Sequence, residues 1–349
     1  MTAPARRVPA RYFVLLRDAL HEQGVDTSLL LRMAALGEGQ LDQREAMLLP
    51  SEAEGFIVAA RRLTGRTDLG FEMGRLIKMT SHDILGLGML SCRNFDQVLR
   101  LISRHYRLMI ETFTLRYQRR LSCGEATCTP KMDMPLETLR FYYEALATSF
   151  QNQVQLMLGP DVEPYDFYLS MPAPPHVARY RTLAPARFHF EERSLPGVRV
   201  VMSAELLDKP LPLADAHALQ RIDERCEVLS QRLPAAVFDW GDYVRMMLRE
   251  AHGKLITLDD LARHINVSAR TIDRHLKKEN LQFRDLSQQV RFERACELLR
   301  APGATVAQVS LSLGFSDAAN FSRAFRRVIG VSPGEFARHN DQPEKLADH

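Results

Sequence analysis

Tryptophan and cysteine are the scarcest residue types in this 349-residue chain, which has one Trp and five Cys. The cysteines are odd in number, and none forms a CxxC pair; they are Cys92, Cys123, Cys128, Cys226 and Cys296. Cys123 and Cys128 could flank a hairpin, but scattered thiols of this kind favour free cysteines over a disulfide or a metal site. No cluster of Cys and His has the spacing of a zinc site, so no metal is expected.

Long apolar runs are also missing from the sequence. Nowhere do eighteen consecutive apolar residues occur, so no membrane-spanning helix is expected. The basic start of the chain, Met1 to Ala10, is followed only by the short apolar segment Phe13 to Leu16, which breaks at Arg17. This segment is too short for a secretion signal. We therefore expect a cytoplasmic protein with no membrane partner.

Motifs for catalysis and for nucleotide binding are absent as well. The stretch Gly86-x-Gly88 lacks the third glycine of a dinucleotide site and the Lys-Ser/Thr ending of a P-loop. Close packing of the backbone against a helix is the simpler explanation of these two glycines. No GxSxG motif occurs. The sequence therefore predicts no cofactor and no enzymatic activity.

Positive charge is concentrated near the C-terminus. The net charge is only +3, yet Lys254 to Arg338 contains 14 Lys or Arg against 9 Asp or Glu. The rest of the chain has 32 basic and 34 acidic residues. A local basic excess is typical of a surface that binds nucleic-acid phosphates.

The basic segment contains two helix-turn-helix patterns in tandem. In the first, Thr257 can cap a helix with Asp260 as its capping-box partner, and the apolar residues of that helix share one face. That face is formed by Leu258, Leu261, Ala262 and Ile265. After a break at Asn266-Val267, Ser268 can cap a second helix that points Ile272 and Leu276 inward.

The second pattern repeats the first about forty-nine residues later. Val306, Val309 and Leu313 form its first buried stripe, and Gly314 permits the turn because glycine tolerates positive φ. In the helix that follows, the residues expected to face the core are Phe321, Phe325 and Val328.

The second helix of each unit carries an exposed polar face that includes arginines. An arginine in the major groove can donate two hydrogen bonds to guanine, and a recognition helix enters the groove by its N-terminal half. A solvated charged face would be the simpler explanation for one such helix, but its repetition after a second turn favours DNA. The candidate DNA-contacting residues are Ser268, Arg270, Thr271, Asp273, Arg274, Lys277 and Lys278 in the first unit and Asp317, Ala319, Asn320, Ser322, Arg323, Arg326 and Arg327 in the second.

Residues from about Asp242 to His339 resemble the DNA-binding domain of the AraC/XylS family of bacterial transcription regulators. The matching segments are Leu261-Ala262, Ser268 to Arg274, Leu313 to Asp317, Asn320 to Arg327 and Gly330 to Pro333. The resemblance implies base reading by Arg270, Asp273 and Arg274, and by Ala318, Ala319, Asn320, Ser322 and Arg323. The two alanines depart from the longer polar residues often found there, and can still contact a thymine methyl group.

The first two hundred residues combine helical periodicity with short alternating strands. The expected helices are 12–23, 51–63, 69–77, 94–109 and 137–158, and the expected strands are 112–117, 126–129, 166–171, 187–190 and 198–202. The sequence thus predicts an α+β sensor domain followed by an all-α DNA-binding domain with two helix-turn-helix units. The expected boundaries are 1–212 for the sensor, 213–234 for a linker or dimer helix, 235–340 for the DNA-binding domain and 341–349 for a tail.

The N-terminal part also resembles a sensor domain, that of the AraC subgroup of ornithine-utilisation and mycobacterial virulence regulators. The match rests on Asp83 to Leu90, on the helix after it and on Ala204 to Pro212. We expect an apolar cavity in which His82, Tyr106 and Tyr142 contact a small-molecule effector. The effector is expected to be a small carboxylate, an amino-acid-like molecule or a fatty acid, and the apolar and aromatic content between Phe95 and Phe150 favours an apolar part in it.

An apolar stripe lies between the two expected domains. Its members are spaced three and four residues apart, as in a coiled-coil seam, and are Leu219, Ile222, Cys226, Leu229 and Leu233. The stripe either packs on its own domain or joins two copies of the chain, and its position beside the linker favours a homodimer contact.

The sequence is therefore interpreted as a ligand-responsive transcription regulator. The expected partners are double-stranded promoter DNA, a second copy of the chain, RNA polymerase and the effector. One alternative is a regulator controlled by a protein partner, with no small-molecule pocket. Another is an enzyme with an accessory DNA-binding part, as in DNA-repair adaptors with a reactive N-terminal cysteine cluster. No cysteine precedes Cys92, which argues against that class.

Overall fold

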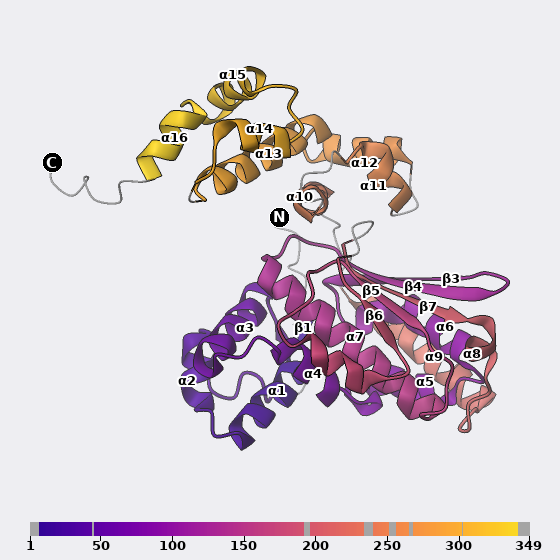
Figure 1. Ribbon diagram of the computed structural model, residues 1–349. Coiled ribbons are helices and arrows are strands. Elements are labelled where there is room, and N and C mark those ends of the chain that lie inside the picture. The colour runs from indigo at the N-terminus through magenta and orange to yellow at the C-terminus, as the bar shows by residue number, and fades with distance from the viewer. Residues whose placement is uncertain are drawn as a thin grey trace. The chain divides into compact units, whose positions relative to one another are not determined.

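The structure is a computed structural model, and it describes residues 7–43, 45–191, 196–233, 240–250, 256–264, 268–301 and 303–340. The chain divides into two compact units, Met1–Phe238 and Asp239–His349 (Figure 1). The expected break at Asn266-Val267, Ile265 before it and the tail 341–349 lie outside the described residues. The helix expected as a separate linker belongs to the first unit.

The first unit is an α+β fold. Its α-helices are α1 (Ala10–Glu22), α2 (Thr27–Met33), α3 (Pro50–Thr64), α4 (Leu69–Leu76), α5 (Asp83–Ser91), α6 (Phe95–His105), α7 (Leu136–Leu158), α8 (Ala204–Asp208) and α9 (Ala216–Arg232). Three short 3₁₀ helices join them, η1 (Met79–His82), η2 (Tyr106–Leu108) and η3 (Val177–Leu183). All five helices expected from periodicity are present, whereas α2, α5 and α8 were not expected.

A five-stranded sheet forms the other layer of this unit. Its strands, in spatial order, are β3 (Phe113–Arg119), β4 (Cys123–Pro130), β7 (Val198–Ser203), β5 (Asp166–Leu169) and β6 (Arg187–His189). Neighbouring strands are antiparallel except for β5 and β6, which are parallel. The expected pairing of 112–117 with 126–129 is confirmed, with Leu115 opposite Cys128. A separate two-stranded pair joins β1 (Val8–Pro9) to β2 (Met47–Leu48).

Helix α7 is the central element of the first unit and runs beside the sheet (Figure 1). Its residues Tyr143, Ala147 and Val154 are almost completely buried. Helix α4 packs against it with backbone contact, because a β-carbon on Gly70 would lie only 2.4 Å from the carbonyl oxygen of Phe141. This close crossing brings side chains of α4 and α7 to the interior of the unit, where the cavities described below are found.

Close backbone packing also explains the Gly86-x-Gly88 stretch, as expected. Both glycines lie in α5. A β-carbon on Gly86 would lie 1.9 Å from the carbonyl oxygen of Met79, and one on Gly88 would lie 2.9 Å from Ile222 of α9. The stretch is therefore a packing surface for a neighbouring 3₁₀ helix and for α9.

The second unit is all-helical. Its helices are α10 (Trp240–Glu250), α11 (Leu258–His264), α12 (Ala269–Lys278), α13 (Phe283–Leu299), α14 (Val306–Ser312), α15 (Ala318–Ile329) and α16 (Pro333–Asn340). Helices α11 and α12 form the first helix-turn-helix unit, and α14 and α15 form the second. Helix α13 contacts α10, α14, α15 and α16.

Other sequence expectations concern thiols and hydropathy. All five cysteines are free. Within the described ranges, no helix is both long enough and apolar enough to span a bilayer. The same ranges contain no group of three or more His, Cys, Asp or Glu arranged to hold a metal ion.

Candidate DNA-binding surface and sensor cavities

Both helices of the first helix-turn-helix unit have a side-chain cap at the N-terminus. The backbone N–H of Thr257 donates to the Asp260 carboxylate at 2.9 Å, and the Thr257 hydroxyl accepts from the Asp260 N–H at 3.1 Å, which is the expected capping box. Ser268 caps α12 by accepting from the Thr271 N–H at 3.1 Å. Ile272 and Leu276 are fully buried, as expected. These contacts fix which face of α12 remains outside.

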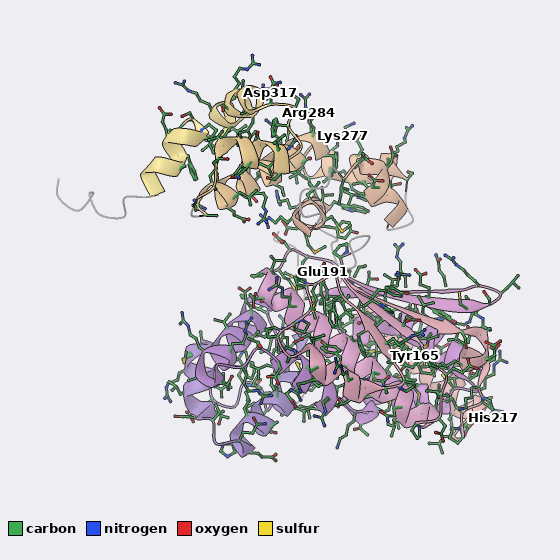
Figure 2. The ribbon with its side chains drawn as sticks, viewed as in Figure 1. Tyr165, Glu191, His217, Lys277, Arg284 and Asp317 are labelled. Carbon is green, nitrogen blue, oxygen red and sulfur yellow. The ribbon has the colours of Figure 1, made fainter. Side chains whose placement is uncertain are left out.

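The outer face of α12 has both paired and unpaired cations. Arg270 and Arg274 are exposed and form no ion pair with any residue that the structure describes. Lys277, labelled in Figure 2, binds Asp273 at 2.7 Å, one helical turn away. Lys278 is exposed. An exposed pair of this kind is worth about 0.3–0.5 kcal/mol, so phosphate can compete for Lys277. The two free arginines are the groups on α12 best suited to reach a base edge.

The second helix-turn-helix unit has the same construction with different residues. Thr305 and Gln308 form a capping box at the start of α14. Gly314 has φ of 73° in the turn, as expected for a glycine that ends a helix. Phe321 and Phe325 are fully buried, whereas Val328 is 45% exposed. The expectation that Val328 faces the core was wrong, because α15 lies against the core over a narrower face than its apolar pattern indicates.

Three polar candidates at the start of α15 form one network. Asp317, labelled in Figure 2, caps the helix by accepting from the Asn320 N–H at 2.6 Å. The side-chain amide of Asn320 donates to the other Asp317 oxygen at 2.6 Å, and Arg323 donates to the side-chain oxygen of Asn320 at 2.6 Å. The hydrogen bond from the Asn320 backbone holds the pKa of Asp317 below its usual value. Asp317 is therefore a cap and a positioning group for Asn320 and Arg323.

The remaining candidates on α15 differ in exposure. Ala319, Arg326 and Arg327 are exposed, and Ser322 is half-buried. In the first helix-turn-helix unit, Thr271 is half-buried and Ser268 is exposed. The structure thus brings the expected residues together on the outer sides of α12 and α15.

Two contacts that hold these helices were not evident from the sequence. Arg291 of α13 donates from Nε to the Leu313 carbonyl at 2.8 Å, and its guanidinium carbon lies 4.0 Å from the centre of the Phe315 ring. Glu279 accepts from the backbone N–H of Gly241 at 2.8 Å and so caps α10 from the end of α12. Each pairs residues distant in sequence, and neither follows a local motif.

The first unit contains two adjoining cavities of about 50 Å³ each. The one we call the His82 cavity is lined by the three expected effector residues, His82, Tyr106 and Tyr142, together with Tyr12, Ser149 and apolar side chains of α1, α4 and α7. The second, which we call the Gln153 cavity, is lined by Gln153, Cys128 and apolar residues that include strand positions of the sheet. The expected apolar cavity is therefore present, and its ligand remains a prediction.

A buried hydrogen-bond chain connects the two cavities. His82 is 4% exposed, and its Nδ1 lies 2.9 Å from the Tyr12 hydroxyl. The Gln153 amide donates to His82 Nε2 at 2.8 Å. Burial, aided by the nearby Arg11 cation, lowers the pKa of His82 to about 3. The imidazole is therefore neutral at physiological pH. Sequence reasoning missed Tyr12 and Gln153, which lie seventy or more residues from His82.

The apolar stripe of α9 packs mainly within the protomer. Leu219 and Cys226 are buried, and Ile222 packs against the core of the first unit beside Gly88. For Leu219 and Cys226 the interpretation as a dimer seam is corrected, since their side chains are already covered within the protomer. Ile222, Leu229 and Leu233 are half-buried, and for them the dimer contact stays a prediction.

Polar contacts fasten α9 to α6. The Nε2 atom of buried His105 lies 2.6 Å from Asp223 of α9, and Arg104 donates to the same carboxylate at 2.5 Å. Tyr106, the next residue after His105, lines both cavities. On the other side, α5 begins directly after His82 and also packs on α9. The cavities and α9 therefore share α5 and α6 as neighbours.

Comparison with known proteins gives a consistent result for both units. Residues 24–211 match a family model described as the arabinose-binding domain of AraC transcription regulator, N-term, and residues 261–339 match a helix-turn-helix domain. The ornithine utilization regulator of Pseudomonas aeruginosa is 26% identical, over 95% of this chain and 96% of its own length. An uncharacterized HTH-type transcriptional regulator of Mycobacterium tuberculosis is 29% identical, over 93% of this chain and 94% of its own. The crystal structure of the transcriptional regulator CdpR from Pseudomonas aeruginosa covers 88% of this chain and 95% of that chain, with 19% identity and a TM-score of 0.42.

The buried neutral His82 predicts a specific acid sensitivity. In the unfolded chain its pKa returns to about 6.5, so between pH 6.5 and 3 the unfolded state binds a proton that the folded state does not. Acid therefore lowers the free energy of unfolding in this window. In a His82→Gln variant, the loss of unfolding free energy with acid should be smaller than in wild type by up to about 1.4 kcal/mol per pH unit.

Denaturant unfolding at several pH values measures this difference. His21→Gln, which changes an exposed histidine of α1, is the control and should show the wild-type slope. An unchanged slope in the His82→Gln variant would contradict the assignment of a buried neutral imidazole.

Proposed function

Because the chain belongs to the AraC family of DNA-binding transcription regulators, we propose that α12 and α15 are its two recognition helices and read successive major grooves of promoter DNA. In this proposal Arg270 and Arg274 read bases in one half of the site, and Arg323 reads the other half. Lys278, Arg326 and Arg327 bind phosphates, as does Lys277 once it leaves Asp273. Ala319 contacts a thymine methyl group.

The observation that carries this proposal is the repeated exposed cationic face on two capped helices. Both helices follow a turn, both bury an apolar face, and both present arginines outward. Helix α13 joins the two helix-turn-helix units and has 17 residues, a length of about 25 Å. That length is compatible with two helices spaced by one duplex turn, about 34 Å.

Substitution of these arginines should separate the two half-sites. Arg270→Ala or Arg274→Ala should weaken protection of one half of each site, and Arg323→Ala should weaken protection of the other half. A good bidentate base contact discriminates by about 1–3 kcal/mol, so altered base preference should be measurable. Footprinting on DNA fragments recovered by genome-wide mapping of binding sites checks this expectation.

The matched control is Arg294→Ala. Arg294 is a surface arginine of α13 that pairs with Glu297 at 2.6 Å and lies on neither recognition helix. Its loss should leave the footprint unchanged. Wild-type footprints from all three recognition-helix variants would show that other residues read the DNA.

We further propose that the first unit senses a small molecule bound in the His82 cavity. Polar groups in a largely apolar cavity are the usual composition of such a site. The alternative, control by a protein partner, requires no cavity in this unit, and the two adjoining cavities favour the small molecule. The chain is proposed to have no enzymatic activity and to act in the cytoplasm, and RNA polymerase is its proposed protein partner at the promoter.

We propose that α9 couples effector binding in the first unit to DNA binding in the second. Binding in the cavities would change the packing at His82 and Tyr106, next to the helices on which α9 rests. Helix α9 ends at Arg232, eight residues before α10 opens the DNA-binding unit. Effector binding and DNA binding must then be coupled in both directions.

Loosening α9 should therefore change DNA affinity without touching the DNA-binding unit. Asp223→Asn removes the charge that binds His105 and Arg104, and Gly88→Ala places a methyl group against Ile222. Typical coupling energies predict changes in operator affinity of roughly fivefold or more. Fluorescence anisotropy with the full chain measures the affinity, and hydrogen exchange measures protection of the α9 amides.

Gly37→Ala is the control for the glycine substitution. Its β-carbon would meet its nearest neighbour, a side-chain atom of Gln40, at an ordinary 3.7 Å. Loss of protection in α9 together with wild-type operator affinity would exclude α9 as the route.

A homodimer joined through the first unit is also proposed, with Leu229 and Leu233 of α9 at the contact. Both are half-buried in the protomer and so retain apolar surface. Sedimentation of a Leu229→Glu, Leu233→Glu variant should give the mass of a monomer, because two buried carboxylates would oppose association. Leu121→Glu, at a fully exposed hairpin position, should sediment as wild type. A dimer that survives the double change places the contact elsewhere.

A further inference from the structure

The two cavities share part of their walls. Tyr106, Met109, Leu146 and Ser149 line both of them. A water-sized group occupies about 10–15 Å³ on this measure, so a cavity of about 50 Å³ has room for about three to five such groups. If the shared wall moves aside, a ligand of about seven to ten non-hydrogen atoms can extend through both cavities.

The described residues around this space carry no formal charge. Neither cavity is lined by Asp, Glu, Lys or Arg. The nearby Arg11 lines neither cavity, and its charge is paired with Asp83 at 2.5 Å, although its buried Nε has no hydrogen-bond partner among the residues that the structure describes. A carboxylate or an ammonium group in the cavity would lose its hydration and would meet no opposite charge on the cavity walls, which is unfavourable. This argues against the carboxylate that the sequence alone led us to expect.

The hydrogen-bond chain supplies a partner for a neutral head group. With the Gln153 amide donating to His82 Nε2, the neutral ring carries its proton on Nδ1 and donates to the Tyr12 oxygen. The Tyr12 hydroxyl proton is then available to a ligand. Rotation of the Gln153 side-chain amide by half a turn reverses the direction of both hydrogen bonds. Tyr12 then donates to His82, and the Tyr12 oxygen can accept from a ligand. Tyr12 can therefore donate to a carbonyl or accept from a hydroxyl or an amide.

We propose that the effector is an uncharged, short-chain aliphatic molecule with one hydrogen-bonding head group, such as an amide, ester, lactone or alcohol. The head group binds at Tyr12 and His82, and the chain extends past Tyr106 toward the sheet. This inference rests on the proposed sensing role of the His82 cavity and adds the charge and size of the ligand.

The test compares two probes of equal chain length that differ in charge, hexanamide and hexanoate. Calorimetry and thermal unfolding with the full chain, from pH 6 to pH 8, measure their binding. Hexanamide should raise the melting temperature in a concentration-dependent way at every pH, because it binds only the folded state. Hexanoate should bind at least tenfold more weakly at pH 7. Its affinity should fall about tenfold per pH unit, following the uncharged fraction of the acid.

A pair of tyrosine variants tests the head-group contact. Tyr12→Phe should weaken hexanamide binding by about two- to tenfold, the usual effect of one lost hydrogen bond. The control, Tyr165→Phe, changes a residue labelled in Figure 2 that lines neither cavity. It removes a buried hydroxyl that donates to Gln151. It should bind hexanamide as wild type does. Equal affinity of the Tyr12→Phe variant and wild type would overturn the assignment of Tyr12 as head-group partner.

The two possible failures are distinguishable. Hexanoate that binds as tightly as hexanamide, with no dependence on pH, would overturn the uncharged ligand and leave the sensing role intact. Absence of binding by both probes would overturn the sensing role of the cavities, and the present inference with it.

Discussion

The contact between the backbone of α5 and helix α9 decides how the regulator is organised. At Gly88 the two helices are so close that a single methyl group would collide with Ile222. Helix α9 therefore belongs to the sensor, although it is the last described helix before the DNA-binding unit in the sequence. Much of the apolar stripe that resembles a coiled-coil seam is buried within the protomer by this contact. The C-terminal end of α9 is the part that remains available to a second copy of the chain.

The same contact connects α9 to residues that line the cavities of the sensor. On one side it rests on α5, which follows His82, and on the other it is fastened to His105, which precedes Tyr106. The two cavities are lined by few polar side chains, and among these His82 hydrogen-bonds to Tyr12 and Gln153. Because a buried polar group without a partner costs about 1–3 kcal/mol, a ligand that engages these groups must match their hydrogen bonds. Specificity can thus arise without any charged contact.

Local patterns predicted what depends on neighbours in sequence. The capping box of Thr257 and Asp260, the turn at Gly314 and the alternation of β3 were all recognisable, because each involves residues only a few positions apart. Contacts between distant residues were not predictable in this way. Arg291 reaches a carbonyl 22 residues away, and Tyr12 meets His82 across 70 residues. Periodicity shows that a helix has an apolar face, but not which surface covers it, which is why the α9 stripe could be assigned to two different partners.

The ion pair between Asp273 and Lys277 has a consequence for the response of this protein to ionic strength. A lysine that binds a phosphate normally contributes to the release of condensed counterions, and so to the salt dependence of DNA affinity. Lys277 already has an intramolecular counter-charge, which it must exchange for the phosphate. The steepness of the salt dependence should then be smaller than the number of basic residues on the two recognition helices suggests. A regulator built in this way would keep its hold on promoter DNA more evenly as the salt concentration of the cell changes.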